Sequence, residues 1–230
     1  MWSSRVHPWP EIEEKLAACQ SPFQLDLVRH GQTDANAGRR FSGASDVPLT
    51  ERGEQQAREL GSRLRGRYDM AFHSSLARSR RTLVLAMGSP EVEADCVVED
   101  ARLAERSLGV LEGRPAVPIR QYEQGDFAYA PEGGEPYTSV AQRVLSFLAD
   151  LGCAATARAQ PLRALACTHV GPMRILVPVL EQTEPSHVLT ARYPNAEVIS
   201  FEVAEPAIPP FLAAALRSAG ANGYDPPAPA

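Results

Sequence analysis

The stretch of sequence that decides the fold is QLDLVRHGQTDANAGRRFSGASDVPLTERGEQQA, residues 24–57. Its first five residues, QLDLV, predict a short buried strand over 24–28. Gly31 follows, and a glycine permits the tight turn that residues with side chains resist. Arg29 and His30 therefore stand at the C-terminal end of a strand, which is where α/β sheets bind their ligands.

The residues after this turn predict alternating helices and strands. Thr50 is a good N-cap for a helix over 50–64, whose first turn carries Glu51 and Glu54. We expect further strands over 68–72, 91–98, 163–167 and 197–203, and further helices over 76–87, 140–151 and 172–180, the last with Pro172 at its first position. This order predicts an α/β fold of three αβα layers, in which helices flank a mostly parallel sheet.

A second histidine-bearing turn, Thr168-His169-Val170-Gly171, follows the strand expected over 163–167. Parallel strands end at the same edge of a sheet, so we expect His30 and His169 to open toward the same side. The residue types in the first turn are suited to phosphoryl transfer. A neutral His30 nitrogen can attack phosphorus while the Arg29 guanidinium holds the phosphoryl oxygens through charge-assisted hydrogen bonds.

At these positions the chain resembles the histidine phosphatase superfamily, which includes cofactor-dependent phosphoglycerate mutases and many small-molecule phosphatases. The matching residues are Arg29-His30-Gly31, Asn36, Gly43, and the run Asp-x-Pro-Leu-Thr-x-x-Gly-x-x-Gln-Ala at residues 46–57. Three later blocks, at residues 73–82, 103–113 and 168–171, keep the order of the family. The resemblance covers about residues 23–203 and implies a phosphoglycerate mutase-like fold.

The resemblance also implies a role for each matching residue. It implies that His30 is the nucleophile, that Glu105 is the proton donor, and that Arg29, Arg78 and His169 bind the transferring phosphoryl group. Glu112 then has a structural role, and Arg80 and Arg81 are solvated helix residues. On the substrate side the expected contacts are Asn36, Ser42, Gly43 and Val170.

Val170 departs from the family, which usually has glycine after its second histidine, and Ser75 replaces a common proline. The backbone N–H of Val170 still permits a phosphate contact, but its isopropyl group would narrow the pocket. Neither change removes a catalytic group. The reaction implied is hydrolysis of a phosphomonoester in two displacements through a phosphohistidine. No metal or other cofactor is expected, because arginines and a histidine neutralise the oxyanions and no carboxylate cluster suits magnesium.

Phosphoglycerate mutases share these groups and carry a basic insertion before the second histidine. Here the irregular segment 114–138 holds two basic residues, Arg114 and Arg120, and four acidic ones, Glu123, Asp126, Glu132 and Glu135, a balance of 2 − 4 = −2. This favours a phosphatase acting on a small, weakly charged sugar, cyclitol or nucleoside monophosphate over a phosphomutase. A catalytically silent phosphate-binding module is a third reading, although both His30 and Glu105 are present.

Other side chains admit two interpretations. The aromatic residues of segment 114–138 either contact a ring of the substrate or pack the segment onto the domain: Tyr122, Phe127, Tyr129 and Tyr137. His7 and His187 are expected to be surface or packing residues. His73, beside the end of a strand, either packs or lines the pocket. Trp2 and Trp9, with a helix over 11–19, are expected to cover a core edge or a subunit contact, which is consistent with a homodimer.

The domain boundaries and setting follow from the same patterns. We expect an N-terminal extension over 1–22, a phosphatase domain over 23–204, and a C-terminal helix with a flexible tail over 205–230. The formal charge of −5 gives no cationic field for nucleic acid or anionic lipid. No secretory signal and no membrane-spanning apolar run are apparent, so we expect a cytoplasmic protein whose four cysteines are buried thiols.

Overall fold

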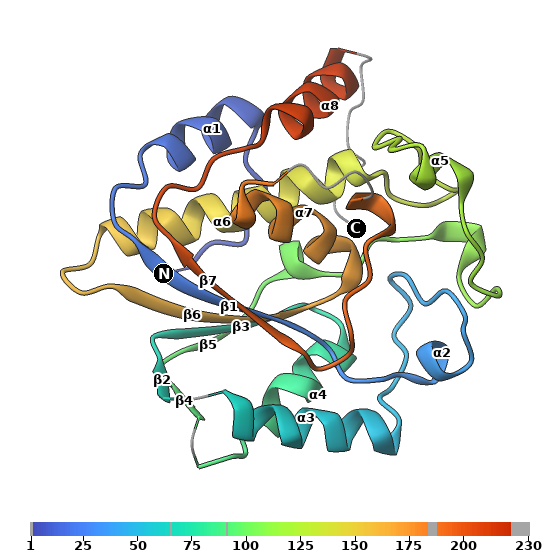
Figure 1. The fold of residues 1–230 in the computed structure, drawn as a ribbon, viewed down its shortest axis with the longest axis horizontal. Coiled ribbons are helices and arrows are strands. Elements are labelled where there is room, and N and C mark those ends of the chain that lie inside the picture. Colours follow the sequence, from blue (N-terminus) through green and yellow to red (C-terminus); the bar gives the residue numbers. More distant parts are fainter. Residues whose placement is uncertain (1, 65, 91, 184–187, 222–230) are drawn as a thin grey trace.

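A five-stranded sheet runs through the middle of the molecule (Figure 1). The computed structural model describes residues 2–64, 66–90, 92–183 and 188–221. In spatial order the strands are β5 (Val97–Glu99), β3 (Met70–His73), β6 (Leu162–Thr168), β1 (Phe23–Arg29) and β7 (Val198–Val203). Neighbouring strands are parallel except for β1 and β7, which are antiparallel. The predicted α/β fold with a mostly parallel sheet is confirmed.

Helices cover both faces of the sheet (Figure 1). One face carries α1 (Trp9–Ala17), α6 (Tyr137–Thr156), α7 (Val170–Glu181) and α8 (Pro210–Ala221), and the other carries α3 (Glu51–Arg63) and α4 (Ala77–Ala86). Along β1, Leu25 and Leu27 point into the first layer and Val28 into the second, as the period of two requires. Among the described helices, none has the length and apolarity that crossing a bilayer demands.

Two predicted strands are each divided by an aspartate. The strand expected over 68–72 becomes β2 (Gly66–Tyr68) and β3, and the strand expected over 91–98 becomes β4 (Val92–Ala94) and β5. β2 and β4 form a separate two-stranded sheet. The carboxylate of Asp69 accepts the backbone N–H of Arg163, and that of Asp95 accepts from Arg67. These side-chain bonds mark the point where the chain crosses between the two sheets.

Three helices begin before their predicted starts, and the first of them, α1, starts at Trp9 rather than at residue 11. α6 starts at Tyr137 rather than at residue 140, and α7 starts at Val170, which places Pro172 at its third position. A proline is tolerated there because the first N–H groups of a helix have no partner within the helix. Segment 114–138 is irregular as expected, apart from the short helix α5 (Arg120–Glu123) and the first turn of α6. His187 and residues 222–230 lie outside the described part of the chain.

The remaining short elements are α2 (Asp34–Ala37) and the 3₁₀ turns η1 (Ala101–Leu103), η2 (Gly109–Leu111) and η3 (Val188–Thr190). The cysteines fit the expectation of buried thiols only in part. Cys19 and Cys167 are buried, whereas Cys96 and Cys153 are exposed, and all four are free. Exposure is tolerated because a thiol is small and weakly polar. Cys96 lies at the crossing between the two sheets, and Cys153 lies on the outer side of α6.

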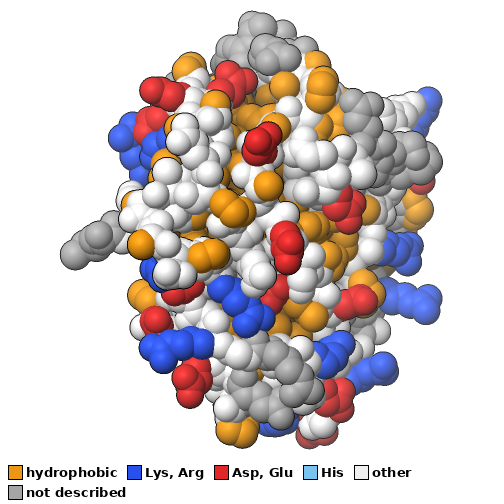
Figure 2. Space-filling model, turned by 60° about the vertical axis from the view of Figure 1, so that its left-hand side comes forward, with side chains coloured by type: hydrophobic (Ala, Val, Ile, Leu, Met, Phe, Trp, Pro, Cys, Tyr) orange, Lys and Arg blue, Asp and Glu red, His pale blue; other side chains and the backbone are white. Residues whose placement is uncertain are grey.

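Charge is mixed over the outside of the molecule. On the face shown in Figure 2, acidic and basic side chains are interspersed among hydrophobic and uncharged ones. Such mixing is ordinary for a soluble surface. A group of side chains with one sign of charge, facing a single pocket, would therefore depart from this pattern.

The N-terminal residues are tied to the domain by Arg102, whose side chain is 1% exposed. Its guanidinium donates to the carboxylates of Asp100 and Asp150 and to the carbonyl oxygens of Ser3 and Arg5. Trp2 donates its indole N–H to Asp100, and Arg102 lies 5.7 Å from the centre of that indole ring. Residues before the first strand are thus packed onto the core.

Removing the charge of Arg102 should destabilise the fold. We expect Arg102→Ala to lower the free energy of unfolding by about 3–5 kcal/mol, because the fully buried Asp100 would keep its charge without a cationic partner. Urea unfolding at pH 7 measures the change. Arg80→Ala, at an exposed position of α4, is the matched control and should stay within about 0.5 kcal/mol of wild type. A loss from Arg102→Ala as small as the control's would contradict the assigned role.

Candidate active site

The ends of β1 and β6 bring the two predicted histidines together. These strands are parallel neighbours, and Arg29 is paired with Thr168 in their register. His30 and His169 therefore follow adjacent strands at one edge of the sheet. Their ring centroids lie 4.9 Å apart, so the predicted convergence of the two turns is present in the structure.

His30 has one nitrogen committed to the backbone. Its Nδ1 lies 2.7 Å from the carbonyl oxygen of Gly31. A carbonyl only accepts, so Nδ1 carries the proton of the neutral ring and Nε2 keeps its lone pair. Burial, with the positive charges of Arg29 and Arg78, lowers the pKa of His30 well below its ordinary 6.5. At neutral pH, Nε2 is therefore unprotonated and carries a free lone pair.

His169 is oriented by Ser74, a residue that the sequence analysis did not assign. The Ser74 hydroxyl lies 2.7 Å from His169 Nε2 and accepts the backbone N–H of Leu76 at 3.3 Å. With that acceptance made, the hydroxyl proton is best directed at Nε2, which leaves the ring proton on Nδ1. Burial and the nearby His30 and arginines lower the pKa of His169 well below 6.5. Its ring is thus neutral, with an Nδ1–H group able to donate.

Arg29 and Arg78 are held by backbone carbonyls rather than by carboxylates. Arg78 is 1% exposed and donates to the carbonyl oxygens of Gly43 and Ser45, each at 2.7 Å. Arg29 donates to the carbonyl oxygen of Tyr193 at 2.6 Å. Burial lowers the pKa of both side chains, that of Arg29 to about 10, so both stay charged at neutral pH.

Three polar atoms of this cluster are buried without a hydrogen-bond partner. They are Arg29 Nε, Arg78 Nε and His169 Nδ1, and only His7 Nδ1 joins them among the described residues. Leaving a buried donor unpaired costs about 1–3 kcal/mol, so such atoms in one place call for an explanation. Phosphate oxygens are natural acceptors for guanidinium and imidazole N–H groups. The cluster is therefore suited to hold a phosphoryl group.

Glu112 anchors the loop that holds Arg78. Its carboxylate accepts the backbone N–H groups of Ala44, Ser45 and Leu108 at 2.9–3.0 Å and also the hydroxyl of Ser45. Gly43 has φ of +50°, and an added Cβ would lie 2.2 Å from Glu112 Oε1. The loop can therefore close on Glu112 only with glycine at this position.

Glu105 is seated on the first turn of α7. Its carboxylate accepts the backbone N–H of Arg106 at 2.8 Å and that of Gly171 at 3.0 Å. An added Cβ on Gly171 would lie 2.2 Å from Glu105 Oε1. The glycine after Val170 therefore leaves room for the acid, and Glu105 is fixed at the site by two backbone donors.

Asn36 is linked to the backbone of His30 through Asn195. The amide of Asn195 donates to the carbonyl oxygen of His30 at 2.9 Å and to Asn36 Oδ1 at 3.2 Å. Asn36 also completes a capping box with Thr33 at the start of α2. Asn195 lies outside the motifs, so no local pattern indicated its role.

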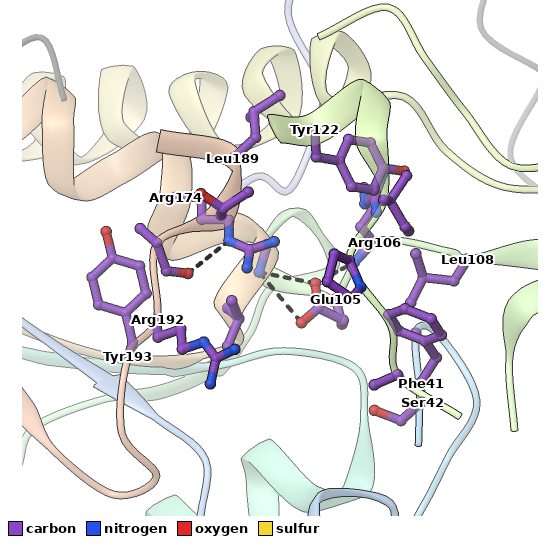
Figure 3. A pocket seen from close by; sticks show the side chains of 18 of the residues that line it. Phe41, Ser42, Glu105, Arg106, Leu108, Tyr122, Arg174, Leu189, Arg192 and Tyr193 are labelled. Atoms are coloured by element: carbon purple, nitrogen blue, oxygen red, sulfur yellow. Dashed lines mark hydrogen bonds between the residues drawn. The ribbon is translucent and has the colours of Figure 1, made fainter. Parts of the chain in front are cut away.

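A pocket of about 480 Å³ adjoins this cluster (Figure 3). Of the predicted site residues, those that line it are Arg29, Asn36, Ser42, Gly43, Glu105 and Val170. His30, Arg78 and His169 do not line it, and their exposures of 3%, 1% and 0% show how deeply they are buried. The pocket is thus the space for the organic part of a ligand whose phosphoryl group would reach the buried cluster. His73 does not line it either.

The pocket contains arginines that the sequence analysis did not assign: Arg40, Arg106, Arg174 and Arg192. The prediction of a weakly charged ligand was drawn from segment 114–138, and it is not supported by the pocket. Arg114 and Arg120 of that segment do not line the pocket, and Glu123 is its one acidic residue that does. Charge counted along a local stretch of sequence missed side chains contributed by other elements.

The aromatic residues of segment 114–138 mainly pack. Arg106 lies 4.4 Å from the ring centre of Tyr122 and 4.3 Å from that of Tyr137. These two tyrosines are buried and in edge contact with each other, and Phe127 packs against Tyr137. Their rings are therefore largely covered by protein, but Tyr122 and Tyr137 also line the pocket, so packing does not exclude a contact with a ligand for these two residues.

The lowered pKa of the two buried histidines predicts a pH dependence of stability. Below about pH 6.5 the unfolded chain takes up protons on these residues while the folded chain does not. The free energy of unfolding therefore decreases as the pH is lowered. The effect is absent above that range and reaches up to about 1.4 kcal/mol per pH unit for each histidine. We expect the free energy of unfolding, measured with urea at several pH values between 7.5 and 5.5, to change less steeply with pH for His30→Gln than for wild type. Equal slopes would contradict a lowered pKa at His30.

Comparison with known proteins places this geometry in context. Residues 25–208 match the Histidine phosphatase superfamily (branch 1). The 2,3-bisphosphoglycerate-dependent phosphoglycerate mutase of Xanthobacter autotrophicus is 29% identical over 191 residues, which cover 78% of this chain and 91% of the mutase. The probable phosphoglycerate mutase GpmB of Klebsiella pneumoniae is 43% identical over 104 residues, 45% of this chain and 47% of GpmB, so this match spans about half of that relative.

A solved structure supports the same assignment. The mycobacterial glucosyl-3-phosphoglycerate phosphatase is 26% identical, with a TM-score of 0.65 over 78% of this chain and 89% of that one. The family match covers most of the chain and includes both histidine turns. With its phosphoglycerate mutase-like fold and its paired histidines at the sheet edge, the chain belongs to branch 1 of the histidine phosphatase superfamily.

Proposed function

We propose that the protein is a metal-independent phosphomonoesterase that hydrolyses a small organic monophosphate through a phosphohistidine intermediate. The observation that carries this proposal is the neutral His30, whose Nε2 lone pair is free while Nδ1 is bonded to the backbone. Arg29, Arg78 and His169 supply the unpartnered buried donors beside it. A nucleophile among fixed cationic and neutral donors is the arrangement that phosphoryl transfer needs.

In the first step, His30 Nε2 attacks phosphorus and the bond from phosphorus to the ester oxygen breaks. Glu105 in its protonated form gives its proton to the departing oxygen, which leaves as an alcohol. Arg29, Arg78 and the Nδ1–H of His169 stabilise the charge on the phosphoryl oxygens. The positive charges were present before the ligand arrived, so little reorganisation accompanies the reaction.

In the second step, water replaces the alcohol. Glu105, now ionised, takes a proton from water while the water oxygen attacks the phosphohistidine. The bond from phosphorus to Nε2 breaks, inorganic phosphate leaves, and His30 and Glu105 return to their starting protonation states. The two backbone bonds to Arg106 and Gly171 keep Glu105 in place for both proton transfers.

A phosphoglycerate-type phosphomutase is the second candidate. The arginines of the pocket and the similarity to phosphoglycerate mutases favour it. A mutase must retain an acidic bisphosphate long enough to return the phosphoryl group. Segment 114–138 contributes mostly apolar side chains to the pocket, Ala116, Val117, Pro118 and Ile119. Segment 114–138 thus lacks the basic insertion that phosphoglycerate mutases carry, and this difference supports hydrolysis, although other elements place arginines in the pocket.

The decisive experiment measures phosphate release from sugar, nucleoside and glycerate phosphates with a chelator present. Wild type should release phosphate and form an acid-labile phosphohistidine, and His30→Ala should lose both. Arg80→Ala, at an exposed position of the same domain, is the control and should retain both. Isomerisation of 3-phosphoglycerate without release would make the protein a mutase. Binding of phosphate esters without either activity would make it a phosphate-binding module.

A second prediction tests the role of Glu105 as the proton donor. We expect Glu105→Gln to slow hydrolysis of an alkyl phosphate by about 10²–10⁴-fold. The loss of phosphohistidine formation should be much smaller with p-nitrophenyl phosphate, whose leaving group needs no proton. Gly171→Ala should produce a similar pattern, because its Cβ would displace the Glu105 carboxylate. Equal losses in phosphohistidine formation on both substrates would rule out Glu105 as the proton donor.

A further inference from the structure

The described chain before α1 forms a strap, residues 2–7, that has no helix or strand of its own. Its carbonyl oxygens at alternate positions accept hydrogen bonds from the domain: those of Ser3, Arg5 and His7. The guanidinium of Arg102 donates to the first two, at 2.8 and 2.9 Å, and the side-chain amide of Gln142 donates to the third at 3.0 Å. Alternate carbonyls that point to the same side are typical of an extended chain. The strap is therefore bound along its backbone against η1 and α6.

Trp2 anchors the beginning of the strap. Its ring centroid lies 4.8 Å from that of Phe72 and 5.9 Å from that of Phe147. Its indole N–H donates to the carboxylate of Asp100 at 2.8 Å. Asp100 and Arg102 are 0% and 1% exposed, and atoms of the strap are bonded to both. The strap thus covers one side of this buried ion pair, and without the strap that side would open to water.

The same ion pair belongs to the turn that leads to Glu105. Arg102 lies in η1, and Glu105 follows it closely in the chain. The carbonyl oxygen of Arg102 accepts from the side chain of Arg143 at 2.6 Å, and that of Leu103 accepts from the hydroxyl of Thr168 at 2.7 Å. These contacts fix the backbone of η1, while the strap fixes the side chain of Arg102. The turn before Glu105 therefore has two sets of supports, and the strap is one of them.

The position of the Glu105 carboxylate depends on this turn. One of its two backbone donors is the N–H of Arg106, which moves with the same segment, and the other is the N–H of Gly171 on α7. A shift of residues 102–106 would therefore move the carboxylate relative to α7. Proton transfer is sensitive to such a shift, because the donor and the acceptor must lie within hydrogen-bond distance. Residues 2–7 precede the part of the chain that matches the family, so the family's motifs do not supply this support.

We propose that the strap is a positioning element for Glu105, which acts through Asp100, Arg102 and η1 and touches no reacting atom. The proposal rests on the proposed function, because it assigns the strap to the step in which Glu105 protonates the departing oxygen. The bound strap keeps η1 where the acid is aligned with the ester oxygen. Its release would weaken proton donation and leave the phosphoryl cluster around His30 in place, because carbonyls of other segments hold the arginines of that cluster.

The test removes the strap in two ways. One variant lacks residues 2–7 and keeps Pro8, the N-cap of α1, and the other is Trp2→Ala, which preserves a test if the shortened chain does not fold. We expect phosphohistidine formation from an alkyl phosphate to slow by about ten- to a hundredfold in the deletion variant and by less in Trp2→Ala. With p-nitrophenyl phosphate, whose leaving group needs no proton, the rate should stay within about twofold of wild type. Hydrogen exchange of the backbone amides of residues 103–106 should become faster by about tenfold.

Two control variants separate positioning from a general loss of stability. Val6→Ala, at an exposed position of the strap, should match wild type in every measurement. Tyr68→Phe removes a hydrogen bond to Asp26 and should lower stability without changing the contrast between the two esters or the exchange of residues 103–106. Unchanged exchange in residues 103–106, or equal losses on the two esters, would overturn the role of the strap and leave the phosphatase proposal standing. If wild type forms no phosphohistidine, the proposed function fails, and the exchange measurement alone decides the role of the strap.

Discussion

Two guanidinium groups, that of the buried Arg78 and that of the half-buried Arg29, form no ion pair with a carboxylate in the described chain, and the rest of the site is arranged around that constraint. An uncompensated buried charge is costly, and the protein offsets it with backbone carbonyl dipoles. Carbonyls satisfy the N–H groups without cancelling the charge. The positive field therefore remains available to an anionic ligand. Burial, together with this field, lowers the pKa of His30 and of His169 and keeps both imidazoles neutral.

A comparison between arginines of this chain shows that the partner, more than the residue type, decides the role. Arg102 is as deeply buried as Arg78, but two carboxylates surround it and fasten the N-terminal residues to the core. Arg78 has only carbonyl partners. The charge of Arg102 is compensated by carboxylates and stabilises the fold. The charge of Arg78 is not compensated by an ion pair. Arg174, held by one carbonyl and one tyrosine hydroxyl, belongs with Arg78.

Much of the fold follows from local sequence, because strand ends, caps and turn glycines are local signals. Thr50 caps α3 through the N–H of Gly53, as its position predicts. The division of strands at Asp69 and Asp95 was not predictable, since it depends on which distant strand each half pairs with. The early start of α7 has a similar cause: its first turn is completed by Glu105, far away in the sequence.

In the site, too, local signals predicted some features, and contacts between distant segments determine the others. The motif residues around both histidines could be named from their spacing and family resemblance, and the structure brings them to one edge of the sheet. The contacts of their supporting residues could not be predicted, although a structural role was expected for Glu112. Glu112 acts on Arg78 through the backbone of residues 43–45, and Ser74 acts on His169 through a single hydroxyl. Such contacts involve one or two atoms from distant segments. They produce no repeating pattern of residue types by which they could be predicted from the sequence.

The charge of the pocket illustrates why counting residues in one segment fails. Segment 114–138 is acidic, yet most of its carboxylates serve elsewhere: Glu135 pairs with Arg143, and Asp126 accepts backbone N–H groups of its own turn. The arginines that line the pocket come from the end of β1, the loop after α2, the loop after η1, α7 and segment 191–193. Electrostatic character belongs to a cavity and not to a stretch of sequence. In this chain, the carbonyls of residues 191 and 193 hold Arg174 and Arg29, so one short segment orients two of the arginines that line the pocket.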